Sequence, residues 1–113
     1  MGFPSPAQDY IEAPLDLNSY FEIGSPSVFF FAVGSDSMIG AGITERHKLI
    51  VDRSVSLKEN DIVIAVVNEK FIVRRIITHN GKRILNAENL RYRNIPIEEA
   101  TIWGVVTGSF IKY

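Results

Sequence analysis

Residues 61–86, DIVIAVVNEKFIVRRIITHNGKRILN, hold three apolar stretches that are separated by two short polar breaks. The stretches are rich in β-branched side chains, which favour strands, and they cover residues 61–67, 70–77 and 82–86. Asn80-Gly81 predicts a tight hairpin because both residues tolerate the positive φ of a type I′ turn. Asn68-Glu69 joins the first two stretches as another tight turn. The segment therefore predicts two consecutive antiparallel hairpins.

The same strand-like composition recurs on both sides of this segment. VFFFAV and KLIVD precede it and TIWGVVTGSFIKY follows it, at residues 28–33, 48–52 and 101–113. In the last of these, Gly104 and Gly108 permit bends or bulges. Since no pattern indicates a helix longer than one or two turns, the sequence predicts a mostly β fold.

The N-terminal segment differs in composition from the rest of the chain. Four of the five prolines lie in the first 26 residues, where they withhold backbone donors and favour extended segments. We expect an extended N-terminal arm over residues 1–26, with a short turn at Leu15–Phe21. The remainder, residues 27–113, has the length of one domain with a single core.

Composition argues against several classes of function. The 12 basic and 13 acidic residues nearly balance, so we expect no nucleic-acid binding through bulk charge and no direct sequence-specific contact with it. The longest apolar runs reach about a third of a bilayer span. Two histidines and no cysteine predict no metal site, and without a P-loop or dinucleotide fingerprint no cofactor is expected. The chain start resembles no secretory signal, which favours the cytoplasm.

Ser37 lies in a small polar segment, Gly34-Ser35-Asp36-Ser37, that separates two apolar runs. It is either a turn residue or a nucleophile held at the end of a strand. A serine hydroxyl reacts only when a base removes its proton, and the two histidines, His47 and His79, both look exposed to solvent. A lysine kept neutral by burial among apolar neighbours is the remaining route.

The stretch KFIVRRII places one cation on each face of its strand. Side chains alternate, so Arg74 shares a face with Ile72 and Ile76, while Arg75 lies on the other face. The pattern alone favours two arginines along a sheet edge, with packed stems and with guanidinium groups in water.

Several motifs together resemble the LexA/UmuD family of self-cleaving serine-lysine peptidases, from Gly2 to about Ile111. In order they are GFPSPAQDYIEAPLDLN, DSMIGAGI followed by LIVD, NDIVIAVVNEKFIVRR and WGVV. The resemblance implies a single peptidase-like domain of curved antiparallel sheets, partly barrel-like, that forms a homodimer. It also implies that Ser37 is the nucleophile, that neighbouring backbone N–H groups form an oxyanion hole, and that a lysine at position 74 is the base.

The sequence departs from the family at the base, because position 74 is arginine. A guanidinium is in practice never deprotonated in proteins, so Arg74 cannot abstract a proton from Ser37, and we expect cleavage to be absent or severely slowed. Lys70 lies on the same strand face but roughly 13 Å along the strand, too far to replace the base.

Two further positions bear on the family resemblance. Ser35 stands where the family usually has glycine, and it would be strained if the loop required positive φ there. Gly2 corresponds to the residue after the family's scissile bond, so the chain resembles the processed form. Ala41-Gly42 follows Ser37 too closely to fold back into its site, and we interpret it as ordinary loop sequence.

The sequence leaves three hypotheses for function. In the first, the chain is a processed SOS mutagenesis subunit of the UmuD type, a dimer that joins a Y-family translesion polymerase. In the second, it is an active peptidase that cleaves its own arm, or a partner's, when a RecA filament on single-stranded DNA promotes docking. In the third, it is the C-terminal domain of a LexA-like repressor. Aromatic residues of the last strand, Trp103, Phe110 and Tyr113, are candidate dimer anchors, although Trp103 also fits a core position.

Overall fold

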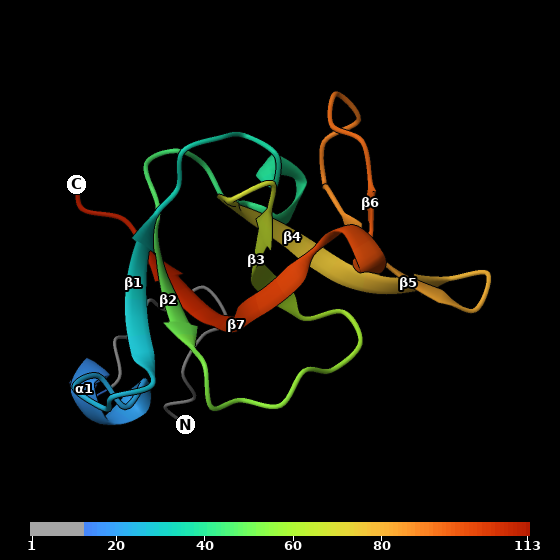
Figure 1. Ribbon diagram of the computed structural model, residues 1–113. Helices are drawn as coiled ribbons and strands as arrows, with labels where there is room; N and C mark the ends of the chain where they lie inside the picture. Colours follow the sequence, from blue (N-terminus) through green and yellow to red (C-terminus); the bar gives the residue numbers. More distant parts are fainter. Residues whose placement is uncertain (1–12) are drawn as a thin grey trace, which may run out of the picture.

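The computed structural model describes residues 13–113 and confirms a mostly β fold (Figure 1). Its helical elements are one α-helical turn and two 3-10 turns, α1 (Leu17–Tyr20), η1 (Ile39–Ala41) and η2 (Ile97–Glu99). The strands are β1 (Val28–Ala32), β2 (Lys48–Asp52), β3 (Ile62–Val67), β4 (Lys70–His79), β5 (Lys82–Asn86), β6 (Ile95–Pro96) and β7 (Thr101–Phe110).

The strands form one seven-stranded antiparallel sheet in the order β1-β2-β7-β3-β4-β5-β6. The last strand, β7, lies between β2 and β3 and joins the two halves of the sheet, as Figure 1 shows. Its pairing shifts register twice, so that Trp103 and Thr107 have no partner residue, each directly before a glycine. The predicted bulges are therefore confirmed, but the strand ends at Phe110 rather than at residue 113.

Both predicted hairpins are confirmed. Asn68 and Glu69 adopt φ of 49° and 64° between β3 and β4, and Asn80 and Gly81 adopt 51° and 76° between β4 and β5. Two consecutive residues with positive φ define the type I′ turn, whose twist matches that of the flanking strands. The hairpins fix the register of β4, and thereby fix which of its side chains face the site.

The core consists of two clusters on opposite faces of the curved sheet. The alternation along β3 sends Ile64 into one cluster and Val63 and Ala65 into the other. The first cluster contains Val33, Met38, Ile43, Leu49, Val51, Ile64 and Val73. Since Met38 directly follows Ser37, this cluster also anchors the loop on which the predicted nucleophile lies.

The predicted arm over residues 1–26 lies partly outside the described residues, which begin at residue 13. Within the described part, the turn expected at Leu15–Phe21 is confirmed as α1, and Asp16 caps this helix by accepting a hydrogen bond from the Asn18 N–H at 3.0 Å. Phe21 then packs against β7, because a Cβ added to Gly108 would lie 2.5 Å from the Phe21 Cε1 atom. No helix of residues 13–113 is long and apolar enough to cross a membrane.

Replacement of Gly104 by alanine tests the packing of the central strand. A Cβ at this position would lie 2.7 Å from Cγ1 of Val51, which is fully buried. We expect Gly104→Ala to lower the free energy of unfolding by about 1–3 kcal/mol, measured by urea denaturation. Gly34→Ala is the control, since its Cβ would meet no atom within 4 Å. Equal stability of the two variants would contradict the packing described here.

Candidate active site

Ser37 lies on the loop between β1 and η1, and this loop is held at both ends. Val33 and Met38 are buried in the core, and the Val33 N–H donates to the carbonyl of His47 at 3.2 Å. Beyond the loop, the Gly40 N–H donates to the Glu88 carbonyl at 2.9 Å, an approach so close that a Cβ at residue 40 would lie 2.7 Å from that oxygen. A residue without a side chain is needed at this contact.

The structure brings Ser37 and Arg74 together. Both are buried, with exposed fractions of 0% and 7%. Arg74 extends from β4, and its Nη1 donates to Ser37 Oγ at 2.9 Å and to the Val73 carbonyl at 2.8 Å. The interpretation that placed both guanidinium groups in water is therefore wrong for Arg74.

The interpretation that placed both arginines along a sheet edge is wrong for Arg75. It does not lie on a sheet edge, because residue 75 pairs with both β3 and β5. Its side chain is half-buried, and Nε pairs with Glu88 Oε1 at 3.0 Å while Nη1 donates to the Asn60 carbonyl at 2.7 Å. The alternation of side chains along β4 placed the two arginines on opposite faces of the strand. It could not show that the loop bearing Ser37 covers the face with Arg74.

Ser35 contacts the predicted nucleophile and is not strained. It is absent from the described residues with positive φ, so the condition for strain at this position is not met. Its Oγ donates to Ser37 Oγ at 3.1 Å and also accepts a long hydrogen bond of 3.4 Å from the Ser37 N–H. The family resemblance implies that backbone N–H groups beside Ser37 form an oxyanion hole. The Ser37 N–H is one of these groups, and in the structure it donates to the Ser35 hydroxyl.

None of the other bases considered from the sequence reaches Ser37. His47 is half-buried rather than exposed, and its Nδ1 accepts from the Thr44 N–H at 3.0 Å. His79 and Lys70 are exposed at the two ends of β4. Within residues 13–113, the hydrogen-bond partners of Ser37 Oγ are Ser35 Oγ, Arg74 Nη1 and the Val73 carbonyl. No partner among these is a base able to take up the serine proton at neutral pH.

Sequence reasoning missed the contribution of the loop before β6. The ring of Tyr92 lies 5.5 Å from the Arg74 guanidinium carbon, within the range of a cation–π contact. The Tyr92 hydroxyl donates to Asp36 Oδ1 at 2.7 Å, and Arg91 Nη2 lies 3.3 Å from Asp36 Oδ2. Asn89 Nδ2 donates to the Asp36 carbonyl at 3.0 Å. The serine loop is thus fastened to a segment more than fifty residues away, which no periodicity signals.

The electrostatics of the site follow from these contacts. Burial lowers the pKa of Arg74, with a smaller opposing effect of Tyr92 and a smaller reinforcing effect of Arg93. The guanidinium nevertheless stays charged, because arginine is not deprotonated under conditions in which proteins fold. The hydrogen bond from Tyr92 and the charge of Arg91 lower the pKa of Asp36, against the effect of its partial burial. The site therefore contains one permanent cation that donates hydrogen bonds to the serine.

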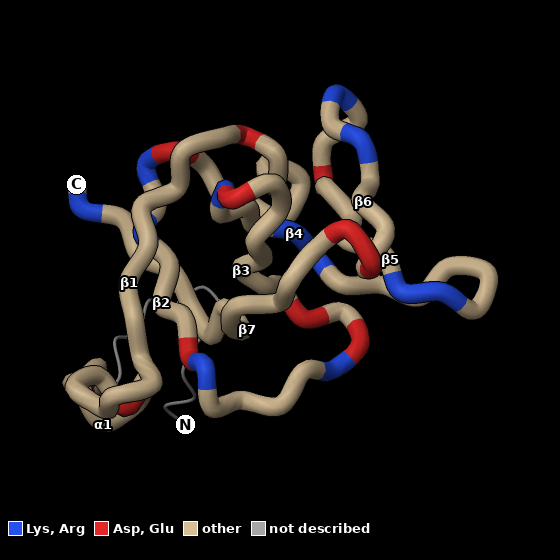
Figure 2. Tube along the Cα trace, viewed as in Figure 1, with Lys and Arg blue, Asp and Glu red and all other residues tan. Residues whose placement is uncertain are grey.

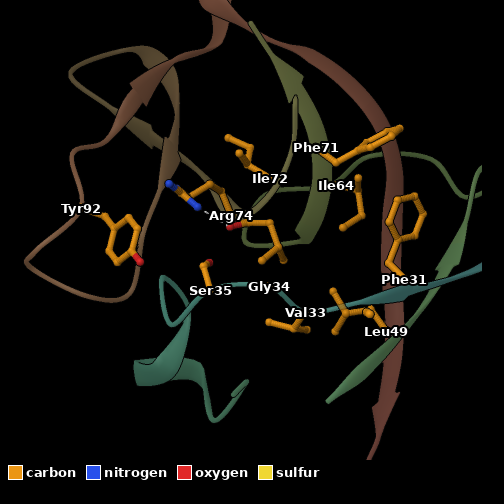
Figure 3. A pocket seen from close by; sticks show the side chains of 12 residues that line it. Phe31, Val33, Gly34, Ser35, Leu49, Ile64, Phe71, Ile72, Arg74 and Tyr92 are labelled. Atoms are coloured by element: carbon orange, nitrogen blue, oxygen red, sulfur yellow. Dashed lines mark hydrogen bonds between the residues drawn. The ribbon is translucent and has the colours of Figure 1, made fainter. Parts of the chain in front are cut away.

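A cleft of about 280 Å³ opens beside Arg74 (Figure 3). It lies between the end of β1 with the loop that follows and the first half of β4. Its lining comprises Phe31, Ala32, Val33, Gly34, Ser35, Leu49, Ile64, Phe71, Ile72, Val73, Arg74 and Tyr92. Most of the lining residues are thus apolar, and two of the polar ones, Ser35 and Arg74, contact Ser37.

Replacement of Tyr92 by phenylalanine tests the fastening of the serine loop. The lowered pKa of Asp36 means that this carboxylate stabilises the fold at neutral pH and loses that contribution as the pH falls through its folded pKa. We expect Tyr92→Phe to raise the pKa of Asp36 in an NMR titration, and to do so more than Arg91→Gln. Tyr20→Phe, which removes a distant exposed hydroxyl, is the control. A larger shift in Arg91→Gln would show that the ion pair dominates.

Comparison with known proteins agrees with the fold and identifies the family. The family model described as peptidase S24-like matches residues 1–107. Protein ImpA of Salmonella typhimurium is 37% identical over 107 residues, covering 94% of this chain and 74% of the relative. Protein SamA of the same organism is 38% identical over 111 residues, covering 98% and 79%. The LexA repressor of Clostridium perfringens is 29% identical over 112 residues, covering 99% of this chain and 55% of the repressor. The chain belongs to the peptidase S24-like family, the family of LexA and the UmuD proteins.

Proposed function

We propose that this protein is a UmuD-like subunit of SOS mutagenesis that acts by binding partners and does not cleave peptide bonds. The observation that carries the proposal is the hydrogen bond from Arg74 Nη1 to Ser37 Oγ. Sequence similarity to ImpA and SamA over most of their length supports the UmuD type. The contacts of Ser37 support the loss of peptidase activity.

The loss of activity follows from the direction of the hydrogen bonds. In a serine-lysine mechanism the neutral amine accepts the serine proton while the oxygen attacks the carbonyl carbon. Here both Arg74 Nη1 and Ser35 Oγ donate to Ser37 Oγ, and the serine proton is directed at the Val73 carbonyl at 3.5 Å. The oxygen lone pairs are engaged and its proton has no acceptor of suitable basicity, so the nucleophile is not activated.

The exposed aromatic side chains support a role in binding. Phe30 and Phe110 are 52% and 44% exposed and contact each other edge to face, and Tyr113 is fully exposed beyond the end of β7. Such residues commonly anchor interfaces, and Phe110 and Tyr113 fit the proposed homodimer. Trp103 fits it less well, because it packs within the chain against Phe31 and other rings.

The remaining partners belong to the same proposal. The dimer joins the catalytic subunit of a Y-family polymerase in the cytoplasm, and a RecA filament on single-stranded DNA is a further partner. The proposal includes no direct contact with nucleic acid. Basic and acidic residues are interspersed along the chain (Figure 2), which supports this part of the proposal. The repressor alternative has less support, because the LexA match has the lower identity and covers little more than half of the relative.

A self-cleavage assay tests the loss of peptidase activity. The chain is extended at its N-terminus so that an Ala-Gly bond precedes Phe3, and cleavage is followed at alkaline pH. We expect no cleavage with Arg74, and a rate at least about 100-fold higher with Arg74→Lys, because lysine can serve as the general base. Ser37→Ala combined with Arg74→Lys is the control and stays uncleaved. Serine-dependent cleavage with arginine in place would refute the proposed mechanism.

A mutagenesis assay tests the binding role independently of cleavage. The chain is expressed with a Y-family polymerase catalytic subunit in bacteria that lack their own UmuD homologue, and mutations are counted after ultraviolet damage. We expect the chain to raise the mutation frequency, and Ser37→Ala to raise it equally because the hydroxyl has no catalytic role. A frequency that falls to background in Ser37→Ala, with the protein still folded, would contradict the proposal.

A further inference from the structure

Ser35 separates the predicted nucleophile from the cleft. Ser37 is 0% exposed and does not line the cleft, whereas Ser35 is half-buried and does line it. Figure 3 shows the Ser35 side chain at the end of the cleft that Arg74 and Tyr92 form. A carbonyl group that approached Ser37 through the cleft would therefore meet Ser35 first.

The Ser35 hydroxyl contacts both groups that such a carbonyl would use. It donates to Ser37 Oγ at 3.1 Å and accepts from the Ser37 N–H at 3.4 Å. In acyl transfer the oxyanion lies about 3 Å from its N–H donors, and the reacting carbon approaches the nucleophile to about 3–3.5 Å. The Ser35 oxygen lies at similar distances from the same two atoms. It thus takes the space that the reacting carbonyl group needs.

The backbone holds the Ser37 N–H in its present direction. The C=O and N–H of one trans peptide unit point in opposite directions, and the Asp36 carbonyl belongs to the same unit as this N–H. That carbonyl accepts from the Ile39 N–H at 3.2 Å and from Asn89 Nδ2 at 3.0 Å. Rotation of the unit would break both bonds, so the Ser37 N–H stays directed at Ser35. The oxyanion donor is therefore preorganised, and a side chain of the same loop occupies it.

A second serine pair in the chain shows which part of this arrangement is local. Ser25 Oγ accepts from the Ser27 N–H at 3.5 Å and lies 3.2 Å from Ser27 Oγ, so a serine can make these contacts wherever the turn allows them. Neither Ser25 nor Ser27 lines the cleft. The pair at residues 35 and 37 differs because Ser37 Oγ also accepts from Arg74 Nη1 at 2.9 Å. The turn alone is thus ordinary, and its position at the site gives it an effect on chemistry.

We propose that the Ser35 hydroxyl occupies the oxyanion hole of Ser37 as an internal ligand and closes the site independently of Arg74. A substrate carbonyl reaches the hole only after this hydroxyl rotates away, which breaks its bonds to Ser37 Oγ and to the Ser37 N–H. The inference deepens the proposed function and rests on it, because it adds a second obstacle to cleavage besides the missing base. Lysine at residue 74 removes the first obstacle and leaves the second in place.

The test removes the hydroxyl from a chain that has regained a base. In the extended chain of the cleavage assay, Ser35→Ala combined with Arg74→Lys is compared with Arg74→Lys alone. We expect cleavage to be about three- to tenfold faster without the hydroxyl, because the oxyanion donor no longer has an internal acceptor. Alanine fits the backbone, since Ser35 is not among the described residues with positive φ.

Ser25→Ala in the same Arg74→Lys chain is the matched control, and its cleavage rate is expected not to change. An equal rate with and without the Ser35 hydroxyl would overturn the inference. A slower rate without it would also overturn the inference, because the hydroxyl would then be a donor to the oxyanion.

A second measurement requires no cleavage. Solvent exchange of the Ser37 amide hydrogen is followed by NMR in the unaltered chain and in Ser35→Ala, and we expect exchange at least about tenfold faster in the variant. Ser25→Ala is expected to leave the exchange at Ser37 unchanged. Equal exchange in folded Ser35→Ala would overturn the inference even if no chain with lysine is cleaved. Cleavage with Arg74 in place would instead refute the proposed function, whereas the amide exchange would still decide the role of Ser35.

Discussion

The pairing of β7 with both β2 and β3 is the interaction on which the rest of the structure depends. It joins the N-terminal pair of strands to the C-terminal meander and brings the end of β1 close to β4 across the curved sheet. Ser37 and Arg74 lie on these two sides and meet only because β7 joins the two halves of the sheet in this way. The bulges before Gly104 and Gly108 let β7 bend without losing its other ladder bonds. The site is therefore a product of long-range pairing rather than of any local motif.

The chemistry of the site turns on the difference between an amine and a guanidinium. A lysine buried at residue 74 could shed its proton, since burial disfavours the charged form and the amine has an accessible neutral state. Arginine experiences the same burial, which lowers its pKa, but its neutral form is not reached. The same location that would make lysine a base makes Arg74 a fixed hydrogen-bond donor. The cation is then accommodated by uncharged oxygens and by the face of Tyr92.

The local elements of the fold could be predicted from the sequence, because they depend on residues close in the chain. The turn residues Asn68-Glu69 and Asn80-Gly81 predicted the hairpins, and family motifs indicated Ser37 and position 74 as candidate site residues. Pattern alone could not show that Arg74 is buried, since that depends on a loop nearly forty residues away. Tyr92 was missed for the same reason, because it lies in a polar segment without periodicity. Non-local contacts of irregular segments leave no signal in a single sequence.

The two outermost strands of the sheet, β1 and β6, differ in their capacity to add another strand. The β6 edge has two residues and includes Pro96, which lacks a backbone donor, so it offers little to an incoming strand. The β1 edge has five residues, VFFFA, without charge or proline, and it exposes Phe29 and Phe30. If a second copy paired through the β1 strand, the enlarged sheet would end in a β6 strand on each side. The short, proline-containing β6 strand disfavours further extension of the sheet from its ends into a fibre.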